Sequence, residues 1–226
     1  MLLTIPGVLD GDTVGQFREA LAAAEWEDGR RTTGYLAARV KRNGQLAEDH
    51  PVAQALGERI LAALERNTAF ISAALPHRVF PPMFNRYGPG ETFGTHVDTA
   101  LRQPAGQLRR MRCDLSATLF LSDPASYTGG ELTIADSYGT HAVKLAPGDM
   151  VLYPASSLHR VEPVIAGVRL AAIFWVQSMV REDPARAMLY DLDSAIQHLG
   201  AAVPDHPAVV QITGVYHNLL RRWAEV

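Results

Sequence analysis

The sequence has little of what is typical of secreted, membrane-spanning or nucleic-acid-binding proteins. It contains one cysteine, Cys113, among 226 residues, which excludes an internal disulfide and fits a reducing compartment. No apolar run approaches the ~18 residues that a membrane-spanning helix needs. A formal net charge of −3 provides no general attraction to nucleic acids or anionic membranes. We therefore expect a cytoplasmic protein without a nucleic-acid or membrane partner.

The N-terminal segment also lacks the pattern of a signal peptide. No basic residue precedes its apolar stretch, and Pro6, Asp10 and Asp12 interrupt that stretch. Cys113 comes before an apolar run, so we interpret it as a buried small residue rather than a reactive thiol. With 47% hydrophobic residues, a chain of this length can bury a sizeable core.

Both ends of the chain have helical periodicity. Apolar residues predict a helix over residues 13–24 and one long or broken helix over residues 52–75, which Pro76 ends because proline cannot continue a helix. Near the C-terminus we expect a helix from Asp183 that Gly200 stops, and a last helix after Pro207. These C-terminal helices could pack on the rest of the chain or join two copies in a homo-oligomer, and the pattern does not choose.

The middle of the chain instead predicts short strands separated by turn residues, such as Asp123–Pro124 and Tyr138–Gly139. The strands are expected near residues 83–87, 93–97, 113–121, 131–134, 141–145, 149–153, 158–162 and 168–177. Eight closely spaced strands favour an antiparallel jelly roll, so the fold class is α+β. We divide the chain into an N-terminal support region (1–77), a β core (78–178) and a C-terminal helical extension (179–226).

Two histidines and one aspartate form a candidate metal site. In an extended strand residues i and i+2 face the same way, so His96 and Asp98 can converge on one point, and His159 is the best third ligand. This is the ligand set of non-haem Fe(II) oxygenases, which leaves positions open for O2 and a co-substrate. The alternative is that His96 and Asp98 are surface turn residues and that His159 is structural.

Arg169 interrupts an apolar strand, where an unpaired cation is costly to bury. Its guanidinium suits the far carboxylate of 2-oxoglutarate, the usual co-substrate of such sites. The alternative is a structural salt bridge with Glu162 or Asp114. We interpret residues 162–167 as a hairpin turn that places the strands of His159 and Arg169 side by side.

Other charged residues have no role assigned from the sequence. The segment from Thr99 to Arg112 carries four arginines and is either a basic lid that gathers an anionic substrate or a solvated loop. The remaining six histidines lack partners at ligand spacing, and we treat them as structural or surface residues. No catalytic residue is expected beyond the metal ligands.

Several segments together resemble the bacterial PKHD-type hydroxylases, a branch of the prolyl-hydroxylase-like Fe(II)/2-oxoglutarate-dependent dioxygenases. The resemblance covers most of the chain, and the segments that carry it are Asn85–Tyr87, Gly94–Asp98, Asp114–Ser122, Gly129–Leu132, Gly148–Pro154, Ser157–His159 and Arg169.

The resemblance implies a double-stranded β-helix core with flanking helices. It also implies Fe(2+) at His96, Asp98 and His159, 2-oxoglutarate at Arg169, and L-ascorbate as a reductant. Tyr87 resembles a tyrosine that often contacts 2-oxoglutarate, although a core role is the alternative. The implied reaction uses O2 to hydroxylate a small metabolite or peptidyl residue, with release of succinate and CO2.

Two other functions compete with this one. An oxidative demethylase of the AlkB type shares the metal ligands, but Arg169 is followed by apolar residues rather than by the second arginine that such enzymes carry. A cupin-like protein could hold a metal without redox chemistry. The sequence leaves the substrate open.

Overall fold

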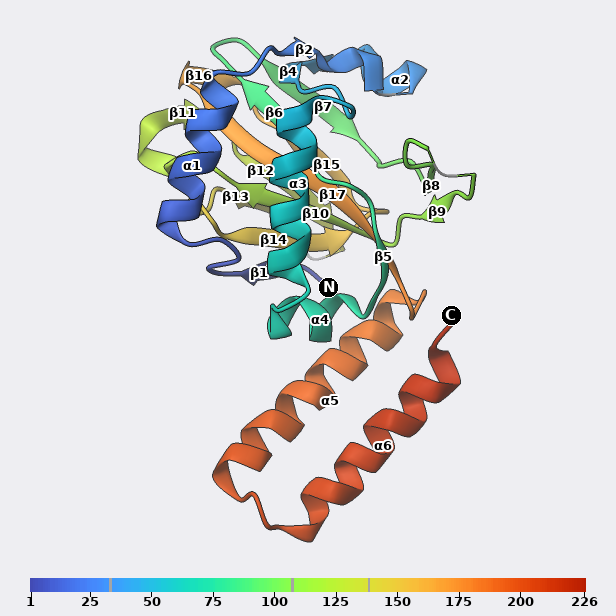
Figure 1. Cartoon of the computed structure of the whole chain (residues 1–226). Helices are drawn as coiled ribbons and strands as arrows, with labels where there is room; N and C mark the ends of the chain where they lie inside the picture. The colour runs from blue at the N-terminus through green and yellow to red at the C-terminus, as the bar shows by residue number, and fades with distance from the viewer. Residues whose placement is uncertain (33, 107, 138) are drawn as a thin grey trace.

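The chain folds into two facing antiparallel sheets, with helices over the outer face of one sheet and a helical hairpin at one end (Figure 1). The structure is a computed structural model that describes residues 1–32, 34–106, 108–137 and 139–226. The predicted turn at Tyr138–Gly139 includes Tyr138, which lies outside the described residues. Helices and antiparallel sheets together confirm the α+β class.

The larger sheet has eight strands. In spatial order they are β1 (Leu3–Ile5), β14 (Met150–Pro154), β10 (Leu115–Phe120), β17 (Arg169–Ser178), β6 (Met83–Tyr87), β4 (Gly44–Gln45) and β2 (Glu27–Asp28), with β5 (Pro76–Val79) also pairing with β17.

The smaller sheet has five strands, in the order β13 (Gly139–Val143), β12 (Leu132–Asp136), β15 (Leu158–Val161), β7 (Thr92–His96) and β3 (Lys41–Arg42). The remaining strands form two-stranded sheets. One pairs β11 (Tyr127–Gly129) with β16 (Val164–Gly167), and the other pairs β8 (Leu101–Arg102) with β9 (Met111–Arg112).

The helices are α1 (Gly11–Ala22), α2 (Tyr35–Ala38), α3 (Pro51–Leu64), α4 (Thr68–Ala74), α5 (Asp183–Ala202) and α6 (Pro207–Trp223). Short 3-10 turns lie at Gly29–Thr32 and Pro124–Ser126. None of the helices formed by the described residues has the length and apolar character needed to cross a bilayer.

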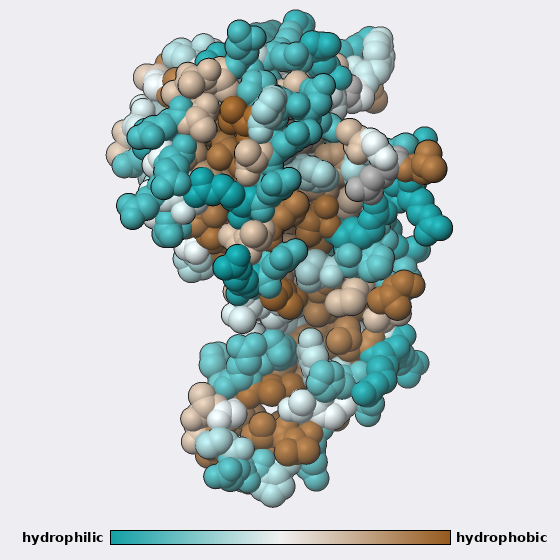
Figure 2. All heavy atoms as spheres, viewed as in Figure 1, coloured by the Kyte–Doolittle hydropathy of each residue, from teal (hydrophilic) through white to brown (hydrophobic). Residues whose placement is uncertain are grey.

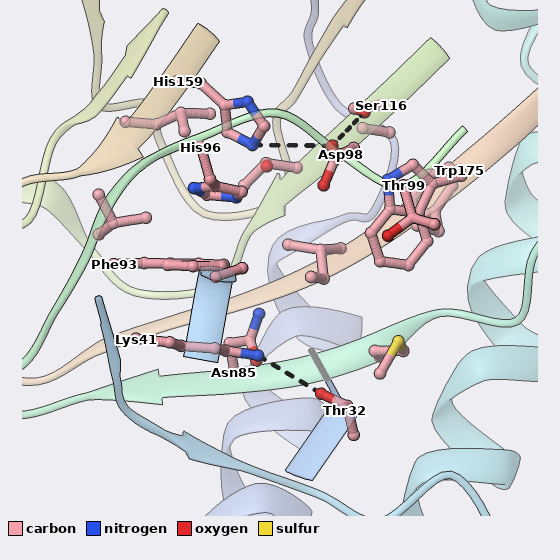
Figure 3. A pocket seen from close by; sticks show the side chains of 18 of the residues that line it. Thr32, Lys41, Asn85, Phe93, His96, Asp98, Thr99, Ser116, His159 and Trp175 are labelled. Carbon is pink, nitrogen blue, oxygen red and sulfur yellow. Dashed lines mark hydrogen bonds and ion pairs between the residues drawn. The ribbon is translucent and has the colours of Figure 1, made fainter. Parts of the chain in front are cut away.

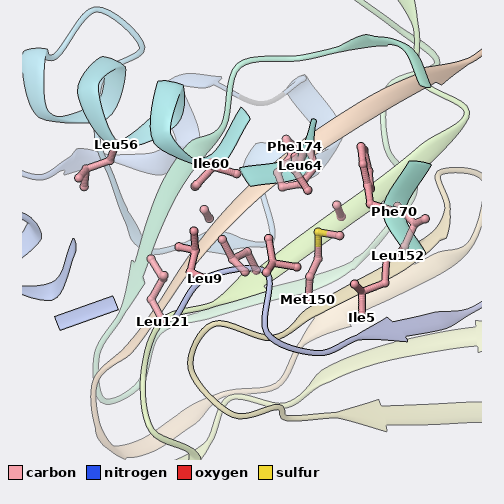
Figure 4. Close-up of a cluster of buried hydrophobic side chains, with 14 of the residues drawn as sticks. Ile5, Leu9, Leu56, Ile60, Leu64, Phe70, Leu121, Met150, Leu152 and Phe174 are labelled. Carbon is pink, nitrogen blue, oxygen red and sulfur yellow. The ribbon is translucent and has the colours of Figure 1, made fainter. Parts of the chain in front are cut away.

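The alternation of side chains along β10 separates two apolar clusters. Leu115, Ala117 and Leu119 belong to the cluster that α1, α3 and α4 cover, whereas Phe120 belongs to the cluster between the two sheets. Figure 4 shows side chains from α3, α4 and the strands meeting in the first cluster, among them Phe174 of β17. The inner face of the large sheet is therefore free to build a site.

The predicted helix over residues 52–75 is broken. The side chain of Asn67 accepts a hydrogen bond from the Phe70 amide at 2.9 Å and so caps a separate α4. Leu75 ends α4 in a left-handed conformation with φ 42°, and Pro76 begins β5. Proline thus marks the end of the helical segment as predicted, because it has no N–H with which to continue a helix.

The eight predicted strands are present, but the predicted hairpin between His159 and Arg169 is wrong. Residues 164–167 form β16, which pairs with β11 rather than serving as a turn. β15 then lies in the smaller sheet and β17 in the larger one. A short turn lies on each side of β16, in place of the single predicted turn. His159 and Arg169 therefore lie on opposite sheets of the sandwich.

The predicted stop at Gly200 is also wrong, because α5 runs on to Ala202. An interior glycine costs only about 1 kcal/mol relative to alanine, and two alanines follow it. The helix ends at Val203, where Pro204 disfavours helical geometry in the preceding residue.

Candidate active site

His96, Asp98 and His159 meet between the two sheets. His96 is the last residue of β7, Asp98 follows two residues later, and His159 lies directly opposite His96 on β15. One ligand atom from each residue lies within 4.8 Å of the others, and His159 Nε2 is 3.6 Å from Asp98 Oδ2 (Figure 3). The structure therefore brings together all three residues that the spacing singled out.

Backbone carbonyls orient both imidazoles. His96 Nδ1 lies 2.8 Å from the carbonyl oxygen of Gly94, and His159 Nδ1 lies 3.0 Å from that of Ser157. Because a carbonyl only accepts, each Nδ1 carries the proton, and each Nε2 keeps its lone pair free for a metal.

The electrostatics of the cluster also suit a metal. Burial, together with the nearby His159, lowers the pKa of His96 to about 4, so the ring is neutral at pH 7. Ser116 donates a hydrogen bond to Asp98 Oδ2 at 2.6 Å. Two imidazoles that each present Nε2 and one positioned carboxylate form a donor set that fits Fe(II).

Arg169 and Tyr87 lie in the same pocket. They face each other across β17 and β6, with the guanidinium carbon of Arg169 5.3 Å from the Tyr87 ring centroid. Burial raises the pKa of Tyr87 to about 12, so its hydroxyl stays protonated. A neutral hydroxyl beside a guanidinium can donate a hydrogen bond to a carboxylate.

Arg169 is a buried cation, and no carboxylate of the described residues pairs with it. Its residue is 1% exposed, its Nε has no hydrogen-bond partner among the described residues, and no ion pair between described residues includes it. The alternative partners are engaged elsewhere, because Glu162 pairs with Arg160 at 2.7 Å and Asp114 with Arg112 at 2.6 Å. The guanidinium is thus ready for an anionic ligand.

The pocket that holds these residues extends toward the N-terminal segment, where Thr32, Gly34 and Ala37 line it. Several residues of this pocket were not predicted from the sequence: Lys41, Gln45, Phe93, Ser116 and Trp175. The sequence could have pointed to Ser116, because it is a polar residue within a mostly apolar strand. Lys41 had no such signal, because it stands among arginines at 39 and 42 that are exposed.

The basic segment 99–112 has divided roles. Arg102 lines the pocket, Arg112 binds Asp114, and Arg109 and Arg110 are exposed. Gln107 lies outside the described residues. Of the four arginines weighed as a basic lid or a solvated loop, only Arg102 therefore lines the pocket.

The histidines set aside in the sequence analysis are not part of the cluster. His50 and His206 cap α3 and α6 through Nδ1, and His141 lies 3.0 Å from Asp136. Cys113 is buried, as expected, and burial raises the pKa of its thiol to about 12.

Known proteins resemble this chain along its whole length. Residues 82–177 match the 2OG-Fe(II) oxygenase superfamily, and residues 183–225 match the PKHD-type hydroxylase C-terminal domain. A PKHD-type hydroxylase of Pseudomonas putida strain W619 is 58% identical over 226 residues, 100% of both chains. A PKHD-type hydroxylase of Bordetella pertussis is 55% identical over the same span, again 100% of both chains.

Solved structures share the fold at low sequence identity. A prolyl-4-hydroxylase from Pseudomonas putida has a TM-score of 0.51 at 19% identity, covering 78% of this chain and 92% of its own. HygX from Streptomyces hygroscopicus, solved with nickel and 2-oxoglutarate bound, has a TM-score of 0.55 at 18% identity, covering 80% and 84%. With relatives this similar over its full length, the chain belongs to the PKHD-type hydroxylases, a family of oxygenase enzymes that use Fe(II) and 2-oxoglutarate.

Proposed function

We propose that His96, Asp98 and His159 hold the ferrous ion, and that Arg169, with Tyr87 beside it, holds 2-oxoglutarate. The observation that carries this proposal is the buried guanidinium of Arg169, which has no carboxylate partner among the described residues and lines the same pocket as the three ligands. The bound iron supplies O2 activation coupled to decarboxylation of 2-oxoglutarate, so that succinate and CO2 leave and a substrate C–H bond is hydroxylated.

The residues of the chain prepare the site for that chemistry. Neutral imidazoles and one carboxylate leave a ferrous site with a net positive charge that favours an anionic co-substrate. Ser116 fixes the orientation of Asp98, and the Phe93 ring stacks on His96 at 3.6 Å between centroids. Burial of the surrounding strands limits the entry of water, which strengthens each of these interactions.

The finer features of the fold and the cell setting belong to the same proposal. The two facing sheets support a double-stranded β-helix, or jelly-roll, core over residues 78–178, with a support region over 1–77 and a helical extension over 179–226. We also propose a cytoplasmic location, in keeping with the single cysteine, and ascorbate as the reductant that restores ferrous enzyme.

The substrate is a small molecule or a peptidyl residue. Membership of an oxygenase family argues against the cupin-like alternative, in which the site binds a metal without redox chemistry. The AlkB-type alternative has a direct test, because turnover of alkylated oligonucleotides coupled to succinate would support it.

Visible spectroscopy tests the ligand assignment. Anaerobic protein with Fe(II) and 2-oxoglutarate is expected to show a weak charge-transfer band, which His159→Ala abolishes and Arg169→Ala weakens. His141→Ala is the matched control, since it removes an imidazole from β13, outside the cluster. A band that is unchanged in both site variants would overturn the proposal.

A further inference from the structure

A second buried cation lies in the pocket beyond Phe93. Lys41 is 2% exposed, and its Nζ lies 5.3 Å from the Phe93 ring centroid. Figure 3 shows Lys41 and Thr32 on one side of that ring and His96 on the other. The ring therefore separates the ammonium from the proposed metal ligands.

The partners of Lys41 do not neutralise it. Nζ donates to Gln45 Oε1 at 2.8 Å and, at a longer 3.5 Å, to Thr32 Oγ1, and both acceptors are uncharged. No ion pair between described residues includes Lys41, even though an unpaired buried ammonium costs several kcal/mol. A methionine would fill the same space without that cost.

Arg102 adds a second positive charge to the same pocket. Its guanidinium carbon lies 3.9 Å from the Trp175 ring centroid and 5.0 Å from that of Phe80. The aromatic faces hold the guanidinium plane, but no ion pair between described residues includes Arg102. Its charge also helps burial to lower the pKa of Lys41 to about 8, as expected for two cations facing one space.

Gln45 supplies a neutral donor beside Lys41. The residue is 2% exposed, and its Nε2 has no hydrogen-bond partner among the described residues. This wall of the pocket therefore presents an ammonium, a guanidinium and an unpaired amide N–H, all of them donors.

The anion that fits these donors is not 2-oxoglutarate. In the proposed function one end of that molecule chelates the metal, and Arg169 takes the other. The Lys41 wall lies on the far side of Phe93 from His96, so its ligand is a second molecule. Met83 and Trp175 lie against Arg102, Ile173 packs with them, and all three line the pocket and offer apolar contact to the body of that molecule.

We propose that the substrate is an organic anion whose carboxylate, or a similar oxyanion, is bound by Lys41, Arg102 and Gln45 Nε2. This inference rests on the proposed function, because it assigns the third component of that reaction. It narrows the substrate from any small molecule or peptidyl residue to one that carries a negative charge next to an apolar body.

Calorimetry with matched acids and amides tests the proposal. Anaerobic protein saturated with Fe(II) and 2-oxoglutarate is titrated at pH 7 with acetate and acetamide, hexanoate and hexanamide, and benzoate and benzamide. We expect at least one acid to bind about tenfold more tightly than its amide, as a charge-assisted hydrogen bond provides. Lys41→Met and Arg102→Met should each remove that preference.

Arg42→Met is the matched control, because Arg42 neighbours Lys41 on β3 but is exposed, and the preference should persist in it. If Lys41→Met fails to fold, Arg102→Met and Gln45→Leu carry the test. The absence of an acid preference in all three pairs, or a preference that survives in both cation variants, would overturn the proposal.

The charge-transfer band, recorded on the same samples, separates the two proposals. A band in the wild-type protein without any acid preference rejects only the anionic substrate. If the wild-type protein shows no charge-transfer band, the proposed function itself is rejected.

Discussion

The two ends of the pocket each hold a buried cation, but different parts of the fold supply them. Arg169 begins β17, a central strand of the larger sheet, and Tyr87 faces it on β6. Lys41 lies on β3, an edge strand of the smaller sheet, next to the N-terminal 3-10 turn. The central strands thus build the end proposed for the shared co-substrate, whereas the end proposed for the individual substrate takes Lys41 and Gln45 from the N-terminal strands β3 and β4 and Arg102 from β8.

Replacing Arg169 should have the largest effect, because it removes the buried cation at the co-substrate end of the pocket. We expect Arg169→Met to weaken 2-oxoglutarate binding about 100-fold or more, because breaking a buried charge pair costs about 3–5 kcal/mol. Titration of 2-oxoglutarate into anaerobic Fe(II) protein measures this. Arg169→Lys keeps the charge but loses the planar fork, so an intermediate loss is expected.

Arg160→Met is the control for Arg169, since it removes a half-exposed arginine paired with Glu162 on β15. Its 2-oxoglutarate affinity should match that of the wild-type protein. Equal affinity in Arg169→Met as well would contradict the role of the buried guanidinium.

The stability of the protein should depend on Lys41 in a particular pH window. The pKa of Lys41 is about 8 in the folded protein against 10.5 for an ordinary lysine, so the unfolded chain binds more protons between these values. The unfolding free energy of the wild-type protein should therefore rise, relative to Lys41→Met, by up to about 3 kcal/mol from pH 8 to pH 10.5. Below pH 8 the difference should be constant.

Urea denaturation of both proteins across this range measures the difference. All other titrating groups are shared, so the difference isolates Lys41. A flat difference from pH 8 to pH 10.5 would show that Lys41 titrates normally and is not buried as a cation.

Ser116 hydrogen-bonds Asp98, one of the proposed metal ligands, and its effect should be smaller. Ser116→Ala removes the 2.6 Å hydrogen bond to Asp98 Oδ2, and we expect Fe(II) affinity to fall about tenfold because the carboxylate loses its orientation. Anaerobic metal titration measures this. Ser122→Ala removes a buried hydroxyl that hydrogen-bonds the backbone of Val168 and Leu170, so it should lower stability and leave metal affinity unchanged.

Much of the fold could be predicted because long elements carry a period. The alternation along residues 115–120 and the helical spacing of Val14, Phe17 and Leu21 both appear in the structure. The two-residue strands β2, β3 and β4 could not be predicted, since two residues show no period. The hairpin after His159 was wrong because the partner of β16 lies more than 30 residues earlier, in β11.

The two ends of the pocket differ in the same way. Arg169 could be predicted because it is the one charged residue in an apolar strand. Lys41 could not, because its burial comes from pairing with Phe93 in β7, a residue 52 positions along the chain. Ordinary solvated arginines surround it in sequence, so only tertiary contacts reveal its position.

The ring of Phe93 has a consequence for regioselectivity. It lies against His96 on one face and near Lys41 on the other, so its thickness sets a fixed spacing between the oxidising centre and the anchoring ammonium. For the proposed anionic substrate, held by its acidic end, we expect hydroxylation at a carbon a set number of bonds from that end. A larger or smaller side chain in place of Phe93 should therefore change which carbon of the product carries the new hydroxyl group.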